Sequence, residues 1–141
     1  SQLYAQRIKL AKPDEYVVLP EVISKEPLGP AVRHGDDDWF DIVKWTLFVM
    51  VDAEELGINS KNVEEMKKST NPDVKRLLGV EGDKGKDFGL ANDWMAVVIK
   101  QVGNYGEIFD RNVGQGSPMK IERGLNALWN VGGLQYAPPV R

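Results

Sequence analysis

The sequence contains no cysteine, and His34 is its only histidine among 141 residues. Without thiols, the chain can form no disulfide, no cysteine nucleophile and no cysteine-ligated metal site. A single histidine also excludes a His-His metal pair within the chain. We therefore expect His34, which stands beside Gly35, to be a solvent-facing turn residue. The absence of cysteine is compatible with an oxidising compartment.

The sequence also lacks an excess of positive charge and a long hydrophobic run. Its 18 Lys and Arg residues are interspersed with 21 Asp and Glu residues, and the formal net charge is −3. A nucleic acid is therefore not an expected partner. The longest apolar run, residues 45–51, is far shorter than the roughly 20 residues that cross a bilayer. Residues 1–12 lack the features of a signal peptide, so we expect a chain that is cytosolic, processed or cut.

What the sequence does contain is enough apolar material for one core, with 42% hydrophobic residues. Apolar spacing and capping residues predict mainly helices, and β-branched runs punctuated by proline predict two or three strands. The expected helices cover residues 2–12 (ended by Pro13), 39–56 (nearly engulfed by the core and ended by Gly57), 59–66, 71–78 and 92–109, and the expected strands cover residues 16–19, 22–24 and 28–33.

Three short motifs resemble reactive or binding sites, and none has the required spacing. The acidic triplet at residues 36–38 is followed by Trp39 and Phe40 where a calcium loop needs ligands, so we expect one of these aspartates to cap the next helix. The glycine-rich residues 79–89 have the wrong spacing for a phosphate loop. Ser24 and Lys25 could in principle form a nucleophile, but adjacent residues of a strand point to opposite faces.

The stretch GNYGEIFDRNVG, residues 103–114, places an aromatic turn between glycines. Val98, Val102, Tyr105 and Phe109 recur at helical spacing through it. This pattern indicates that the apolar seam of the preceding helix continues past Gly103. We interpret the stretch as packing rather than as a binding site.

Several longer motifs together resemble one family. PEVISKEPLGP (residues 20–30), WFDIVKW (39–45), GNYGEIFDRNVG, RGLNALW (123–129) and GGLQYAPP (132–139) are similar, in order, to the C-terminal part of the polar amino-acid receptors of ABC importers. Among these, the bacterial extracellular solute-binding proteins of family 3, the sequence resembles the general L-amino-acid-binding branch. The resemblance covers essentially all 141 residues.

The resemblance implies an α/β fold, namely the helix-rich C-terminal part of a two-lobed periplasmic-binding-protein (type II) fold that is incomplete on its own. Residues 1–12 would end the second lobe, and residues 13–26 would form the connecting strand between the lobes. Residues 27–141 would complete the first lobe with its C-terminal helices and tail. The hinge would lie at Ser24, Lys25 and Glu26.

The function that the resemblance implies is capture of L-amino acids in the periplasm and delivery to a membrane permease. The ligand-binding residues are not assigned, because the family's main anchors for the α-carboxylate and α-amine fall upstream of Ser1. No cofactor, metal or catalytic residue is expected. The implied partners are the amino acid, the permease, and either the missing N-terminal part of the receptor or a second copy of the chain.

Two alternative functions remain open at this point. A few relatives of the fold are dehydratases, but such an enzyme needs a general acid or base in its cleft, and the sequence offers no suitable pair of residues. The other alternative is a stand-alone interaction module, in which exposed sheet edges bind another chain.

Overall fold

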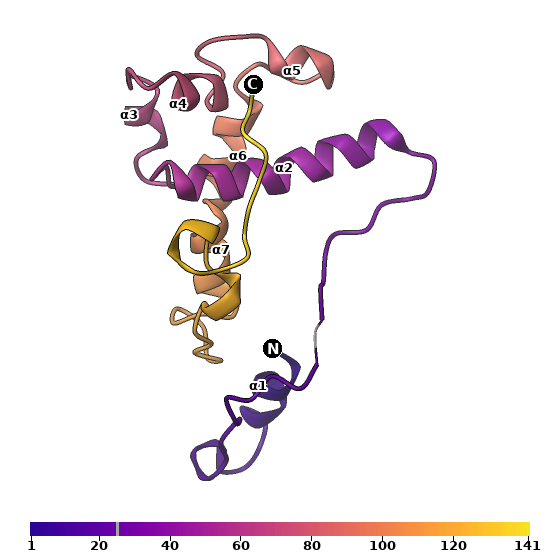
Figure 1. The fold of residues 1–141 in the computed structure, drawn as a ribbon, viewed down its shortest axis with the longest axis vertical. Coiled ribbons are helices and arrows are strands. Elements are labelled where there is room, and N and C mark those ends of the chain that lie inside the picture. Colours follow the sequence, from indigo (N-terminus) through magenta and orange to yellow (C-terminus); the bar gives the residue numbers. More distant parts are fainter. Residues whose placement is uncertain (25) are drawn as a thin grey trace.

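A computed structural model describes residues 1–24 and 26–141 of the chain. The described residues form a helical body, an N-terminal unit that lies apart from it, and an extended segment that joins the two (Figure 1). No helix in these residues is long and apolar enough to cross a membrane. The helices are α1 (Gln2–Arg7), α2 (Asp37–Glu55), α3 (Val63–Met66), α4 (Pro72–Leu77), α5 (Lys84–Asp87), α6 (Trp94–Val102) and α7 (Tyr105–Asn112), and the 3-10 turns are η1 (Pro13–Glu15), η2 (Gly124–Asn126) and η3 (Trp129–Val131).

The longest helix, α2, begins and ends where the sequence signals predict. Asp36 accepts a hydrogen bond from the Trp39 backbone at 3.3 Å, and so satisfies one of the free N–H groups of the first turn. Asp37 and Asp38 lie in that turn, where negative charge is favourable. Gly57, with a φ of 69°, follows the last turn. The predicted continuous helix and its cap are both confirmed.

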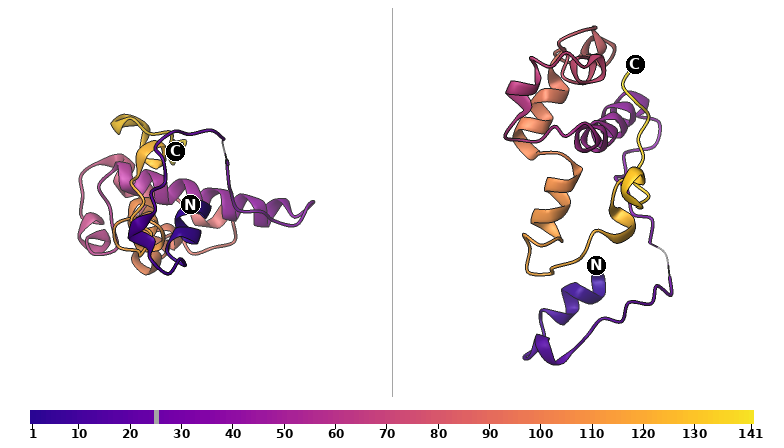
Figure 2. Two further views of the ribbon diagram at one scale, coloured as in Figure 1. Left: turned by 90° about the horizontal axis from the view of Figure 1, so that it is seen from below. Right: turned by 60° about the vertical axis from the view of Figure 1, so that its left-hand side comes forward.

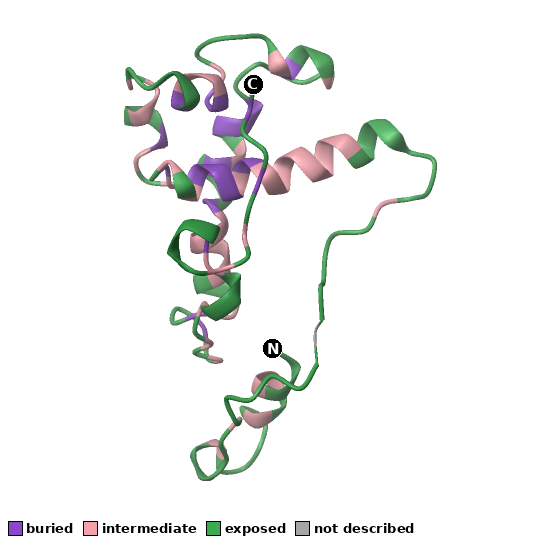
Figure 3. Ribbon diagram, in the orientation of Figure 1, coloured by how far each residue is buried: buried purple, intermediate pink, exposed green. Residues whose placement is uncertain are grey.

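The prediction that α2 is buried on most of its circumference is wrong for its first half. Trp39 and Phe40 are 52% and 47% exposed, whereas Val49, Val51 and Ala53 are at most 2% exposed. Residues 37–40 are exposed, residues 41–48 are half-buried, and full burial begins at Val49, so the start of the helix projects beyond the body (Figure 3).

The main core forms where the second half of α2 crosses α6. Buried aliphatic side chains such as Val49 and Ile99 each contribute about 1.5 to 3 kcal/mol on full burial. A smaller cluster on the neighbouring face of α2 joins Val51 to the C-terminal tail through Leu128 and Ala137. The buried residues of the main cluster are Val49, Ala53, Ile58, Val63, Val74, Leu77, Leu78, Trp94, Met95, Ala96, Ile99 and Val140.

Helices α6 and α7 follow one another beside α2, with a break between them (Figure 2). Gly103 has a φ of 85°, and a Cβ at this position would approach the Glu107 side chain to 2.7 Å. Asn104 then starts α7 with a capping box. The predicted apolar seam is therefore divided: Val98 packs on the main core, Val102 is 39% exposed, and Tyr105 packs on the smaller cluster.

The N-terminal unit and the segment after it differ from the expectation in two ways. Helix α1 ends at Arg7, and Pro13 begins the turn η1 instead of stopping a longer helix. Residues 16–19, 22–24 and 28–33 are extended, but they form no strand in the structure as described. A strand needs the backbone groups of a neighbour, and the described part of the chain brings none beside these residues.

Candidate functional site

The segment that joins the N-terminal unit to the helical body is the candidate site of motion. We call residues 13–26 the connecting segment. After the turn η1, the described residues of this segment have no regular secondary structure and no buried side chain. Figure 1 shows the chain passing α1 and then running as a single extended length towards the helical body. Such a segment can bend without breaking packed contacts.

Apolar side chains along this region stand in solvent to an unusual degree. Val17, Val22 and Ile23 are 78%, 77% and 96% exposed, and Leu28 is 84% exposed. An extended run with free backbone groups and exposed aliphatic side chains is suited to pairing with another strand. The described residues of the connecting segment therefore combine an extended backbone with an exposed apolar surface.

The structure describes two of the three predicted hinge residues. Ser24 and Glu26 are exposed and lie in extended chain, and the Glu26 carbonyl accepts a hydrogen bond from the Leu28 backbone at 2.9 Å. Lys25 lies outside the described residues. The hinge at Ser24, Lys25 and Glu26 stays a prediction, as do the boundaries of the three regions.

The anchor at the other end of the connecting segment is the N-terminal unit, which is held by local contacts. The Arg7 guanidinium donates to the Tyr16 carbonyl at 3.5 Å and lies 5.9 Å from the centre of the Tyr4 ring. Lys12 and Glu15 form an exposed ion pair at 2.7 Å. Exposed contacts of this kind contribute about 1 kcal/mol or less each, so the unit has no core of its own.

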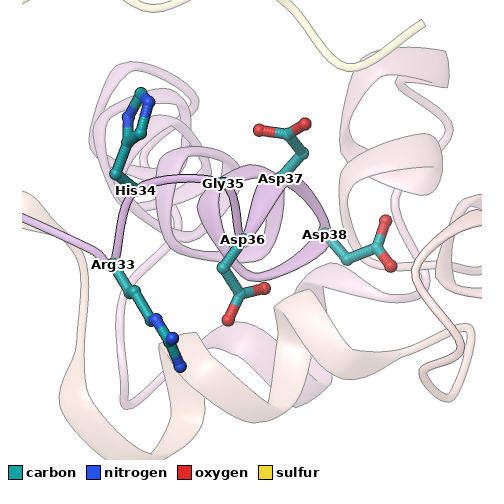
Figure 4. A pocket seen from close by; sticks show the side chains of 6 residues that line it. All are labelled: Arg33, His34, Gly35, Asp36, Asp37 and Asp38. Carbon is teal, nitrogen blue, oxygen red and sulfur yellow. The ribbon is translucent and has the colours of Figure 1, made fainter.

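A wide hollow of about 490 Å³ lies where the chain enters α2, and consecutive residues 33–38 line it. Their side chains diverge: His34 and Asp37 point to one side of the backbone, and Arg33 and Asp36 point to the other (Figure 4). Among the described residues, no group of three or more acids and histidines is arranged to hold a metal ion. The hollow is an open turn, and His34 is exposed in it as predicted.

The stretch GNYGEIFDRNVG acts as a structural junction, which supports its interpretation as packing. The Glu107 carboxylate accepts from the Asn104 backbone at 2.9 Å and from the Ser60 hydroxyl at 2.6 Å. The Asn104 amide donates to the Ile58 carbonyl at 2.8 Å. Burial raises the pKa of Glu107, but the hydrogen bonds from Ser60 and Asn104 outweigh it, and the net pKa is lowered.

One group of charged residues was missed by the sequence interpretation. Asp52, which lies within the helix predicted at residues 39–56, is only 7% exposed. Burial, together with the nearby carboxylates of Glu55 and Asp73, raises the pKa of Asp52 to about 7. Asp73 and Asp52 lie 21 positions apart in the sequence, so no local motif could have signalled their proximity.

Comparison with known proteins covers the whole chain. No family model matches it. The chain is 68% identical to the general L-amino acid-binding periplasmic protein AapJ of Rhizobium johnstonii and 67% identical to the putative amino-acid ABC transporter-binding protein YhdW of Escherichia coli. It is 53% identical to the glutamate/glutamine/aspartate/asparagine-binding protein BztA of Rhodobacter capsulatus. Each match covers 100% of this chain and 42% of the relative.

A solved structure has the same fold as the chain over the matched residues. The chain superimposes with a TM-score of 0.93 and 62% sequence identity on an ABC transporter/periplasmic binding protein from Brucella ovis with glutathione bound. The match covers 99% of this chain and 44% of that one. The expected fold class, a helix-rich part of a periplasmic-binding-protein fold, is confirmed. The chain is therefore similar over its whole length to part of the general L-amino-acid-binding periplasmic proteins of ABC transporters, and it spans 42% of the length of the curated relatives it matches.

Proposed function

We propose that this chain is part of a periplasmic receptor that captures L-amino acids and delivers them to an ABC permease in the membrane. The observation that carries the proposal is identity of 62% to 68% along the whole chain, with relatives whose names describe binding proteins and with a receptor structure of the same fold. These relatives are binding proteins rather than enzymes, so the dehydratase alternative has no support.

The chain would supply architecture rather than the main ligand anchors. The family resemblance puts the groups that grip the α-carboxylate and the α-amine upstream of Ser1. In agreement, the described residues form a packed helical body whose charged groups are exposed, joined in ion pairs or held in caps, apart from the cluster around Asp52. The connecting segment would link the two lobes, with the hinge at Ser24, Lys25 and Glu26.

The ligand class is best described by a free amino-acid head group. The name of one relative, BztA, cites glutamate, glutamine, aspartate and asparagine, and the Brucella structure holds glutathione. Glutathione ends in a γ-glutamyl group, which carries a free α-amine and a free α-carboxylate. We infer that the complete receptor recognises this head group and tolerates different extensions beyond it, because paired charges on the head supply the strongest hydrogen bonds.

Calorimetry on a complete receptor that carries this chain tests the proposal. Glutamine, glutamate and glutathione should bind with micromolar or tighter affinity. N-acetylglutamine and glutamine α-amide, each of which lacks one charge of the head group, should bind at least a hundredfold more weakly. Equal affinity for the blocked and free compounds would contradict recognition of the head group, and no binding of any of them would contradict the receptor function.

A second candidate, a stand-alone interaction module, is favoured by one observation: the exposed aliphatic side chains of residues 17–28. In the receptor, this surface would be covered by the rest of the same protein or by a second copy of the chain that exchanges its N-terminal arm. Light scattering followed by mass spectrometry under denaturing conditions separates these cases. A chain that stays fully folded as a monomer of 15.8 kDa would exclude both a bound remainder of the receptor and an exchange of arms between two copies.

A further inference from the structure

A small cavity of about 110 Å³ lies between the end of α2, helix α4 and the C-terminal tail. Its lining combines three carboxylates with aliphatic walls. Asp52, Glu55 and Asp73 supply the carboxylates, and Leu56, Leu77, Pro139 and Val140 supply the walls.

The carboxylate of Asp52 has an unsatisfied oxygen at this cavity. Its Oδ2 is buried and has no hydrogen-bond partner, and the residue is 7% exposed. Buried polar atoms without a partner are rare in folded proteins, because each lowers stability unless something binds it. The Oδ2 atom of Asp52 therefore lacks a hydrogen-bond donor.

The other two carboxylates of the cavity are only partly satisfied. Glu55 accepts one hydrogen bond, from the Trp129 indole at 3.1 Å, and Asp73 is paired with Arg76 at 2.5 Å. In the part of the chain that the structure describes, no ion pair reaches Asp52 or Glu55. Of the three carboxylates, only that of Asp73 is paired with a positive charge, that of Arg76.

The shape and chemistry of the cavity suit an organic cation better than a metal ion. Calcium would need six or more oxygens within about 2.6 Å of one point, and the described residues hold no such group of ligands. An ammonium or guanidinium group instead donates several hydrogen bonds to separate carboxylates, and its aliphatic stem packs on apolar walls.

We propose that this cavity is a binding site for a single alkylammonium or alkylguanidinium group, whose charged head pairs with Asp52 and Glu55. The stem would lie against Leu77 and Val140. Two sources have this chemistry: a free small amine or guanidine, and a Lys or Arg side chain from outside the 141 residues. This proposal does not depend on the proposed function.

Titration with n-butylguanidinium and n-butylammonium tests the site, with neutral n-butylurea as the matched probe. The titration is made on the 141-residue chain and on a complete receptor saturated with glutamine, so that the amino-acid site is occupied. We expect the cations to bind the chain, and we expect Asp52→Asn to weaken that binding at least tenfold. Butylurea should not bind. Asp38→Asn, at an exposed position of the same helix, is the matched control and should bind the cations as the parent does. Circular dichroism confirms that each variant is folded.

The complete receptor distinguishes the two sources. If it also binds the cations, the ligand is a free molecule. If it does not, and Asp52→Asn lowers its melting temperature at pH 8, a basic side chain of the receptor already fills the cavity. Either result supports the site. Equal binding of the cations by the parent chain and the Asp52→Asn chain would overturn the site. It would also be overturned if the receptor does not bind the cations and Asp52→Asn raises the melting temperature of the receptor. If the 141-residue chain is unfolded, the receptor measurements decide.

Discussion

The carboxylate of Glu107 joins parts of the chain that lie 47 positions apart. It accepts hydrogen bonds from the backbone and the hydroxyl of Ser60 while it closes the capping box of α7 with Asn104. Caps and charge-assisted hydrogen bonds each contribute about 1 to 3 kcal/mol. This one side chain therefore fixes the loop after α2 against the start of α7.

Replacing Glu107 with Ala should lower the free energy of unfolding by about 2 to 3 kcal/mol at pH 7, because it leaves the Ser60 and Asn104 donors without their acceptor. Since the folded pKa of Glu107 is lowered, its contribution is present above its ordinary value of 4.5 and is lost as the pH falls below it. Urea denaturation from pH 3 to pH 8 measures both effects. Glu65→Ala, at an exposed position, is the control and should change stability by less than about 0.5 kcal/mol.

Asp52 should make the stability of the chain depend on pH in the opposite direction. Its folded pKa is raised from 3.8 to about 7, so the folded chain binds a proton that the unfolded chain releases. Stability of the chain should therefore fall as the pH rises from about 4 through 7, and level off above. Glu55 and Asp73 are the charged groups beside it, and Asp73 is itself paired with Arg76.

The substitution Asp52→Asn tests this directly in the chain without added cations. It removes the charge and should raise the free energy of unfolding at pH 8 by up to about 4 kcal/mol, with little effect at pH 4. Urea denaturation at the two pH values measures the difference. An equal effect at both values would mean that Asp52 does not titrate in this range.

At the scale of elements, α2 shows that one helix can be half core and half surface. Phe48 packs on the smaller cluster and lies 5.7 Å from the centre of the Trp45 ring, whereas Phe40 near the other end is 47% exposed. Phe48→Asp would place a charge against an apolar cluster and should cost more than about 3 kcal/mol. Phe40→Asp is the matched control and should cost less than about 1 kcal/mol. Thermal melts of the two variants give the comparison, and similar melting temperatures would contradict the division of α2.

The sequence predicted those elements whose signals are local. Asp36 caps α2, Asn71 caps α4 with Pro72 in its first turn, and Gly57 follows α2, because each signal acts within a few residues. The segments that were predicted as strands are extended but unpaired, because strand pairing depends on a neighbouring strand that local sequence does not reveal. The cavity at Asp52 was missed for the same reason, because it is built from α2, α4 and the tail.

The connecting segment is the element on which lobe closure would depend. If the hinge includes Ser24, then Ser24→Pro, which fixes φ near −65°, should restrict closure of a complete receptor and weaken glutamine binding by about tenfold. Small-angle scattering with and without glutamine measures the closure itself. Glu21→Pro, in the same extended segment but outside the hinge, is the control. Equal closure in the two variants would place the hinge elsewhere.

At the scale of the whole molecule, the chain combines a packed helical body with an N-terminal part that buries almost nothing. The buried residues fall between Val49 and Val140, whereas residues 1–33 contain no buried side chain among those described. The exposed apolar residues of the connecting segment are explained if the rest of a receptor covers them. The chain spans 42% of its curated relatives, which leaves ample protein to do so.

The proposed function makes this chain a structural part of an amino-acid receptor that does not itself carry the anchors for the ligand. The most direct test is calorimetry with glutamine on the 141-residue chain and, side by side, on a complete receptor that contains it. Loss of both charged anchors should cost several powers of ten in affinity. We expect micromolar or tighter binding by the complete receptor and no binding by the chain at millimolar glutamine. Micromolar binding by the chain alone would contradict the account.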